Sequence, residues 1–180
     1  WFASHGWPVD EALLTCFTGQ RADDVLAHTD GPWSGQDIPT MVQELLNLMH
    51  TATPPDLMDG ARELIDQANV PLALVTSAQL AWARICLGTR LRNFQVLVTR
   101  DDVRHGKPDP EPYLTACLRL GISPARVWTV EDAPAGVASA RAAGVGQVVA
   151  ITTTFPSSDL TAAHRIVPGL LAVHQMLDET

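Results

Sequence analysis

The sequence predicts an α/β fold in which a parallel sheet with flanking helices is joined to a small all-helical subdomain. From Pro71 onward, short apolar segments alternate with helix-like segments of roughly ten residues, which is typical of a parallel sheet. Earlier in the chain, two amphipathic segments follow each other without a strand-like segment between them. We therefore divide the chain into a helical part, residues 1–56, and an α/β core, residues 57–180.

The helical part is expected to contain two helices, VDEALLTCFTGQRADDVLAH and DIPTMVQELLNLMH. Both segments repeat apolar residues at helical spacing. The segment TATPPD that follows is typical of a linker.

The core is expected to alternate strands and helices. The expected strands are PLALVT, FQVLVT, ARVWTV, GQVVAI and the short HRIV. The expected helices are QLAWARICL, EPYLTACLRLG and PAGVASARAAG. Gly121 and Gly144 mark the ends of the last two helices, and Pro134 marks the start of the third, since proline is favoured at helix starts and glycine just past helix ends.

Composition narrows the classes of function. The 180 residues, 46% of them hydrophobic, suffice for one core with a small satellite. A formal net charge of −8 argues against nucleic acid and anionic membranes as partners. The apolar runs are too short to span a membrane. Cys16, Cys86 and Cys117 lie far apart in the sequence, which indicates reduced thiols and a cytoplasmic location.

Polar residues follow three of the expected strands. Thr76 and Ser77 close LALVTSA, Lys107 lies in RHGKPDPEPY after the second strand, and Glu131 and Asp132 follow the third. Because the carboxyl ends of parallel strands meet at one edge of the sheet, these residues are candidates for a common site.

Glu131 and Asp132 are two like charges at the end of a buried strand, and they repel each other unless a cation lies between them. Mg²⁺ suits this position, because it binds carboxylates together with phosphate oxygens. The alternative is structural: Asp132 caps the following helix and Glu131 is a solvated turn residue.

The other candidates also have structural alternatives. Several prolines stiffen the loop around Lys107, which can fix its charge in place, but a lysine in a turn is also an ordinary surface residue. Thr76 and Ser77 can present hydroxyl and N–H groups to an anion at a helix start, or they can simply end the strand and cap the next helix.

Taken together, the three features are more specific than any one of them. A hydroxyl, a lysine about 30 residues later and an acidic pair about 25 residues after that, each following a strand, resemble the haloacid-dehalogenase superfamily. GKPDPEPYL, VEDAPAGVASARAAG and AITTTF are most similar to its helical-cap phosphatases for sugar and polyol phosphates, such as glycerol-phosphate and deoxyglucose-phosphate phosphatases; β-phosphoglucomutase is a related group. The resemblance covers essentially the whole chain.

The resemblance implies roles for the core residues. Thr76, Lys107 and Asp132 would be catalytic, while Thr76, Ser77 and Lys107 would bind the phosphorylated substrate. Glu131 and Asp132 would hold Mg²⁺. The core would be a Rossmann-like sheet, and the reaction would be hydrolysis of a small sugar or polyol phosphate through an aspartyl-phosphate. A phosphosugar mutase and a non-catalytic module that binds phosphorylated metabolites remain alternatives.

The resemblance also implies that residues 1–56 form a cap that closes over the substrate. We expect the protein to be a monomer or a weak dimer. Arg21, just after Gly19, is then the candidate for a substrate contact from the cap. Its alternative is a solvated helix arginine paired with Asp24 or a neighbour.

The family also uses a nucleophilic aspartate on a first strand that reads roughly DxDG, and residues 1–180 do not contain that pattern. Asp56 and Asp59 in PPDLMDGARELI have the wrong spacing and no apolar strand before them. We expect the missing strand to precede residue 1 by roughly 20–30 residues, which is the length of one strand and part of a helix. Loss of catalysis, or a first strand from another segment, are the alternatives.

Overall fold

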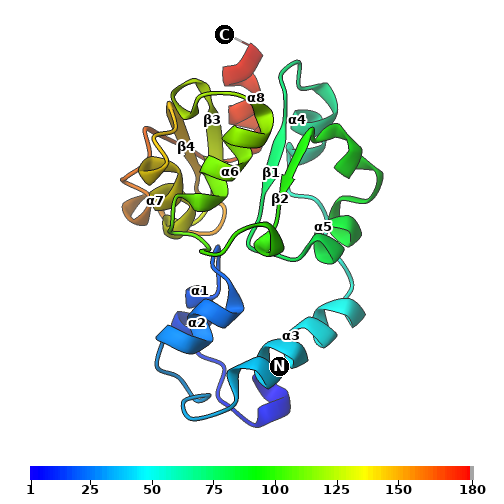
Figure 1. Cartoon of the computed structure of the whole chain (residues 1–180), viewed down its shortest axis with the longest axis vertical. Helices are drawn as coiled ribbons and strands as arrows, with labels where there is room; N and C mark the ends of the chain where they lie inside the picture. Colours follow the sequence, from blue (N-terminus) through cyan, green and yellow to red (C-terminus); the bar gives the residue numbers. More distant parts are fainter. Residues whose placement is uncertain (179–180) are drawn as a thin grey trace.

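A computed structural model describes residues 1–178, and residues 179–180 of the expected core lie outside the described part. The chain forms two parts (Figure 1). The helical part, drawn blue to cyan, contains three α-helices: α1 (Glu11–Cys16), α2 (Ala22–His28) and α3 (Ile38–Thr51). The strands and the remaining α-helices form the second part, in which every expected strand and helix of the core is present.

The first expected helix of the helical part is two helices, so that prediction was wrong. α1 and α2 are separated by a turn that contains Gly19, whose φ is +76°. Backbone in this left-handed region strongly favours glycine. A Cβ at Gly19 would also lie 2.6 Å from the Cβ of Ala133 in the core, so the turn can approach the core only because a glycine is there. The amphipathic pattern continued across this break and concealed it.

The helical part has its own apolar cluster. Phe2, Val25, Leu26, Trp33 and Met41 are all buried in it. The Trp33 ring is 1% exposed and packs edge to face on Phe2, and its Nε1 donates to the carbonyl of Thr29 at 3.0 Å. The buried residues of this cluster and the apolar residues packed against them all lie within residues 1–45, so the helical part has a core separate from that of the sheets.

The strands form two separate parallel sheets among the described residues. One sheet pairs β1 (Ala73–Val75) with β2 (Val96–Val98). The other has the order β3-β4-β5, with β3 (Trp128–Glu131), β4 (Gln147–Ile151) and β5 (Arg165–Val167). The parallel α/β class is thus confirmed, but β1 and β3 are not hydrogen-bonded to each other, so the strands do not form one continuous sheet.

Helices cover both faces of β4. Val148 and Ala150 of β4 pack with Tyr113 and with residues of the helix that follows β3, whereas Val149 and Ile151 pack with Val173 on the opposite face. Neighbouring strand residues point to opposite faces, so each face receives alternate side chains. The α-helices of the second part are α4 (Ala61–Gln67), α5 (Leu80–Leu87), α6 (Glu111–Leu120), α7 (Pro134–Ala142) and α8 (Leu170–Asp178). Residues of all of these except α5 belong to the clusters around β4.

Short 3₁₀ turns complete the described chain: η1 (Ala3–His5), η2 (Gly88–Asn93), η3 (Arg100–Asp102), η4 (Pro124–Arg126) and η5 (Ser157–Asp159). Of these, η3 matters for the site, because it begins the loop that leads from β2 to α6. Across residues 1–178, every helix falls short of the length and apolarity that a membrane span requires.

Candidate active site

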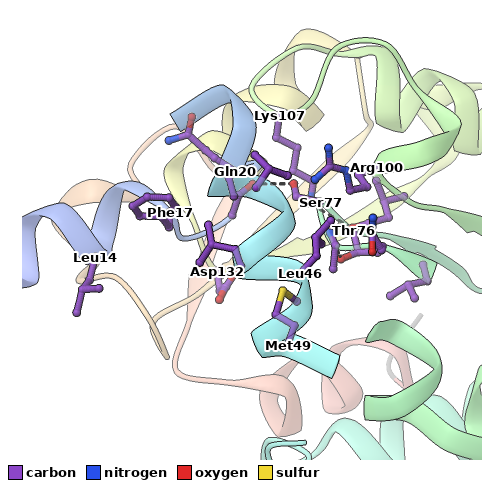
Figure 2. A pocket seen from close by; sticks show the side chains of 18 of the residues that line it. Leu14, Phe17, Gln20, Leu46, Met49, Thr76, Ser77, Arg100, Lys107 and Asp132 are labelled. Carbon is purple, nitrogen blue, oxygen red and sulfur yellow. Dashed lines mark hydrogen bonds between the residues drawn. The ribbon is translucent and has the colours of Figure 1, made fainter. Parts of the chain in front are cut away.

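A cavity of about 730 Å³ lies between the helical part and the carboxyl ends of β1 and β3 (Figure 2). Its walls include Thr76, Ser77, Lys107, Glu131 and Asp132. The structure therefore brings together all of the candidates that follow the three strands, as expected for the carboxyl edge of a parallel sheet.

Lys107 bridges the two sheets. Its side chain is 7% exposed, and its Nζ donates to Oε1 of Glu131 at 2.5 Å and to the carbonyl of Val75 at 3.2 Å. Val75 ends β1 and Glu131 ends β3, so one ammonium group holds the ends of two strands that do not pair. A buried lysine with these partners is not the exposed turn residue of the structural alternative.

Glu131 is also buried, with 6% of its surface exposed. Its Oε1 accepts a second hydrogen bond from the hydroxyl of Tyr113 in α6. Burial, together with the negative charge of Glu131, raises the pKa of Tyr113 well above its ordinary value, so this hydroxyl stays protonated and donates. Gly136 leaves the space that the carboxylate fills, since a Cβ there would collide with Oε2. The cation that offsets the negative charge of Glu131 is therefore the ammonium group of Lys107.

Asp132 lines the cavity and is half-buried. Its Oδ2 accepts a hydrogen bond from Thr154 at 2.6 Å. The N-cap of α7 is Ala133, and no side chain caps that helix, so the helix-cap alternative for Asp132 was wrong. Asp132 thus brings a carboxylate to the cavity while Glu131 is held by Lys107 and Tyr113. Mg²⁺ binding by both carboxylates stays a prediction.

Thr76 and Ser77 both line the cavity, but their hydroxyls differ. Thr76 Oγ1 accepts from the N–H of Ala78 at 3.1 Å, which leaves its own hydrogen available to another acceptor. Ser77 Oγ donates to the carbonyl of Gly19 at 3.0 Å, which ties the end of β1 to the helical part. Neither residue caps α5, whose N-cap is Gln79.

Arg21 is not brought into the cavity, although Gln20 and Ala22 on either side of it line the wall. Its side chain is 7% exposed and donates three hydrogen bonds to carbonyls of the loop after β2. The structure therefore fits neither the substrate contact that the sequence predicted nor the solvated helix arginine of the alternative.

Three residues of the site were not singled out from the sequence: Arg100, Tyr113 and Thr154. Arg100 lines the cavity from η3, and its only sequence signal was its place just after an expected strand. Tyr113 and Thr154 lie within GKPDPEPYL and AITTTF, the segments that carried the family resemblance. Their partners are 18 and 22 residues away in sequence, a separation that no local pattern reveals.

Asp132 is the sole aspartate that lines the cavity within residues 1–178. Asp56 and Asp59 are both exposed in the segment between α3 and α4 and do not line it. Their wrong spacing in the sequence thus agrees with their position in the structure.

Residues 3–150 match the model of the haloacid dehalogenase-like hydrolase family. The chain belongs to this family. Among curated relatives of this haloacid dehalogenase-like hydrolase, validoxylamine A 7'-phosphate phosphatase of Streptomyces hygroscopicus subsp. limoneus is 37% identical, covering 96% of this chain and 84% of the relative. Hexitol phosphatase A of Escherichia coli (strain K12) is 35% identical, covering 94% of this chain and 80% of the relative.

A crystal structure of a hydrolase from Pseudomonas syringae matches with a TM-score of 0.80 and 23% identity, covering 99% of this chain and 87% of that chain. At this identity the likeness concerns the fold. It supports the arrangement of helical part and α/β core that positions the cavity of this haloacid dehalogenase-like hydrolase.

Proposed function

We propose that the protein hydrolyses the phosphate monoester of a small sugar or polyol with the help of Mg²⁺. The observation that carries the proposal is the meeting of Thr76, Lys107 and Asp132 in one cavity at the carboxyl ends of two parallel strands. Two relatives over nearly the whole chain are phosphatases of a validoxylamine phosphate and of hexitol phosphates by name, which supports this substrate class.

The chemistry of phosphoryl transfer suits these residues. The transfer depends mainly on positioning and on neutralising the charge of the phosphoryl oxygens. Lys107 presents an ammonium group that Glu131 and Val75 hold in place, so its position is set before substrate binds. The hydroxyl of Thr76, which accepts from the N–H of Ala78, can donate its own hydrogen to a phosphoryl oxygen.

The donor set fits Mg²⁺, which in phosphoryl-transfer sites uses one or two carboxylates together with substrate oxygens. Asp132 is the better placed direct ligand, since it lines the cavity with one oxygen bonded to Thr154. Glu131, whose Oε1 is already paired with Lys107, would act beside it. Bound there, the ion would neutralise phosphoryl charge.

The nucleophile belongs, in this proposal, to an aspartate on a strand that pairs between β1 and β3, and the intermediate is an aspartyl-phosphate. Two observations support it. Among the strands within residues 1–178, β1 and β3 each lack a pairing partner on the cavity side. Leu74, Val75 and Val130 line the cavity between them, and apolar side chains there suit a buried strand. Residues 1–56 would close over the site as a cap.

The helical part favours a phosphatase over a phosphosugar mutase. A mutase must hold a second phosphate, which calls for cationic side chains on the cap side of the cavity. Within the described residues, the cap side is lined by apolar side chains and Gln20, and the lysine and arginine side chains of the lining, Lys107 and Arg100, come from the core.

The free thiols of Cys16, Cys86 and Cys117 support a cytoplasmic location.

The test uses the full-length protein and its Asp132→Asn and Lys107→Ala variants, with Asp56→Asn as the matched control in the exposed linker. Calorimetry should show weaker Mg²⁺ binding in Asp132→Asn only. Hydrolysis of a panel of hexitol, pentitol and hexose phosphates should fall by about 10²-fold or more in both site variants, since each removes charge stabilisation in the transition state. Wild-type Mg²⁺ affinity and turnover in Asp132→Asn would overturn the proposal.

A second comparison tests the nucleophile. Residues 1–180 alone should not hydrolyse an aryl phosphate with Mg²⁺, whereas the same chain preceded by the nucleophile-bearing strand should do so and should melt at a higher temperature. Full activity of residues 1–180 alone would place the nucleophile within them, and Asp56 and Asp59 would be tested first.

A further inference from the structure

The loop that leads from β2 to α6, residues 100–107, carries two cations into the cavity. Arg100 lies at its start and Lys107 at its end, and both line the cavity. The position of the loop therefore decides where the ammonium group of Lys107 stands.

A buried arginine from the helical part holds the middle of this loop. The guanidinium group of Arg21 donates to the carbonyls of Arg100 at 2.8 Å, Val103 at 2.7 Å and Arg104 at 3.0 Å. The loop passes so close to this side chain that a Cβ at Gly106 would lie 2.8 Å from the Arg21 Nε. Three carbonyl dipoles that point at one spot repel one another, and a cation placed there offsets the repulsion.

Other residues of the loop form hydrogen bonds and an ion pair within the core. Asp102 accepts from the N–H and the hydroxyl of Thr99 and pairs with Arg119 at 2.7 Å. The Glu111 carboxylate accepts from the N–H groups of Arg104 and His105. None of these contacts involves the helical part, whereas the three hydrogen bonds of Arg21 come from it.

A second contact joins the same two segments. Asp23, in the first turn of α2, pairs with Arg100 at 2.9 Å. Arg21 is the N-cap residue of α2, so the start of this helix contacts the loop at two successive points. Because both contacts cross from the helical part to the core, displacement of α2 breaks both.

We propose that Arg21 is a positioning residue that couples the placement of the cap to the placement of Lys107. With the cap in place, the guanidinium occupies the centre of three loop carbonyls, and the loop holds Lys107 between Val75 and Glu131. Without it, the carbonyls lose their common donor and the loop relaxes. The kinetic consequence rests on the proposed phosphatase function, but the structural consequence does not.

A substrate ligand and a positioning residue differ in how their loss is felt. Removing a contact to the leaving group changes KM and depends on which sugar or polyol is esterified. Removing the support of Lys107 lowers kcat, because that cation acts on phosphoryl oxygens common to every substrate. The loss should then be the same for a hexitol phosphate and for a plain aryl phosphate.

The test compares Arg21→Met, which keeps the aliphatic stem, and Arg21→Lys, which keeps the charge, with Arg62→Met, an exposed arginine in α4, as matched control. In the full-length protein, amide exchange over residues 100–106 should become at least about ten-fold faster in Arg21→Met. Arg21→Lys should rescue only in part, since a point charge replaces a planar fork. Arg62→Met should match the wild type.

In Arg21→Met, kcat should fall by about 10–100-fold on all phosphates with KM little changed, as expected when a catalytic group is misplaced by a fraction of an ångström to an ångström. Adding Arg21→Met to Lys107→Ala should change little further. Unchanged exchange over 100–106, or a loss confined to the KM of particular substrates, would overturn the proposal. The exchange experiment needs no turnover, so failure of the phosphatase function leaves it decisive.

Discussion

The two sheets of the core differ in how completely they are covered. In β4, Val148, Val149 and Ala150 are each 0% exposed, because β4 pairs on both edges and is covered on both faces. All three residues of β1 are only partly buried, since β1 pairs with β2 on one edge and faces the cavity on the other. The cavity therefore lies against β1 and β3, which each have an unpaired edge among the described residues, and not against the fully paired β4.

Lys107 and Glu131 join the two halves. The lysine comes from the loop after β2 and the glutamate from the end of β3, so their ion pair crosses the interval between the sheets. Both side chains are less than 10% exposed, which makes the pair costly to break from one side. Stability and function therefore depend on the same contact.

The largest effect is expected from Glu131→Gln, which leaves the buried Lys107 without its counter-charge. The free energy of unfolding should fall by about 3–5 kcal/mol, the usual cost of removing one partner of a buried ion pair. Urea denaturation measures it, with Glu63→Gln in the exposed first turn of α4 as control. A loss below about 1 kcal/mol would mean that the two halves are not joined through this pair.

A smaller effect separates the two halves directly. Val149→Ala in β4 should cost about 2 kcal/mol, from the two methyl groups lost and the cavity left in a fully enclosed strand. Leu74→Ala in β1 removes more carbon but should cost only about 1 kcal/mol, because that side chain is partly buried and can be replaced by solvent. Equal losses in thermal and urea unfolding would contradict the contrast between the strands.

The smallest expected effect is a local loss of stability at acidic pH. Hydrogen bonds from Thr99 and Arg119 lower the pKa of Asp102, although burial alone would raise it, and the N–H groups of Arg104 and His105 lower the pKa of Glu111. A carboxyl whose pKa is lower in the folded state stabilises it above the unfolded pKa, about 3.9 for Asp and 4.3 for Glu, and loses this contribution as pH falls through the folded pKa.

The loop at residues 100–107 should therefore loosen below about pH 4 while β4 stays protected, and amide exchange as a function of pH measures both regions. Asp102→Asn should weaken this pH dependence and, at neutral pH, shift Tm by less than about 2 °C, since the pair with Arg119 is largely exposed. Simultaneous acid opening of the loop and β4 would show that the two regions unfold as one unit.

The order of strands and helices in the core could be predicted from the sequence, because the alternation of short apolar runs with capped amphipathic segments is local. Four of the core residues that meet at the site could also be predicted from the sequence, whereas Arg100, Tyr113 and Thr154 could not. Thr76, Lys107 and the Glu131–Asp132 pair each follow a parallel strand, and parallel topology alone brings such positions to one edge.

The partners of these side chains became known from the three-dimensional structure alone. Lys107 pairs with Glu131 and not Asp132, Tyr113 donates to the same oxygen, and Arg21 turns from the cavity to three carbonyls about 80 residues away in sequence. Side-chain direction and partner choice depend on burial and on contacts between segments distant in the chain. No periodicity or spacing encodes these contacts, because they exist only once the two sheets and the helical part have packed together.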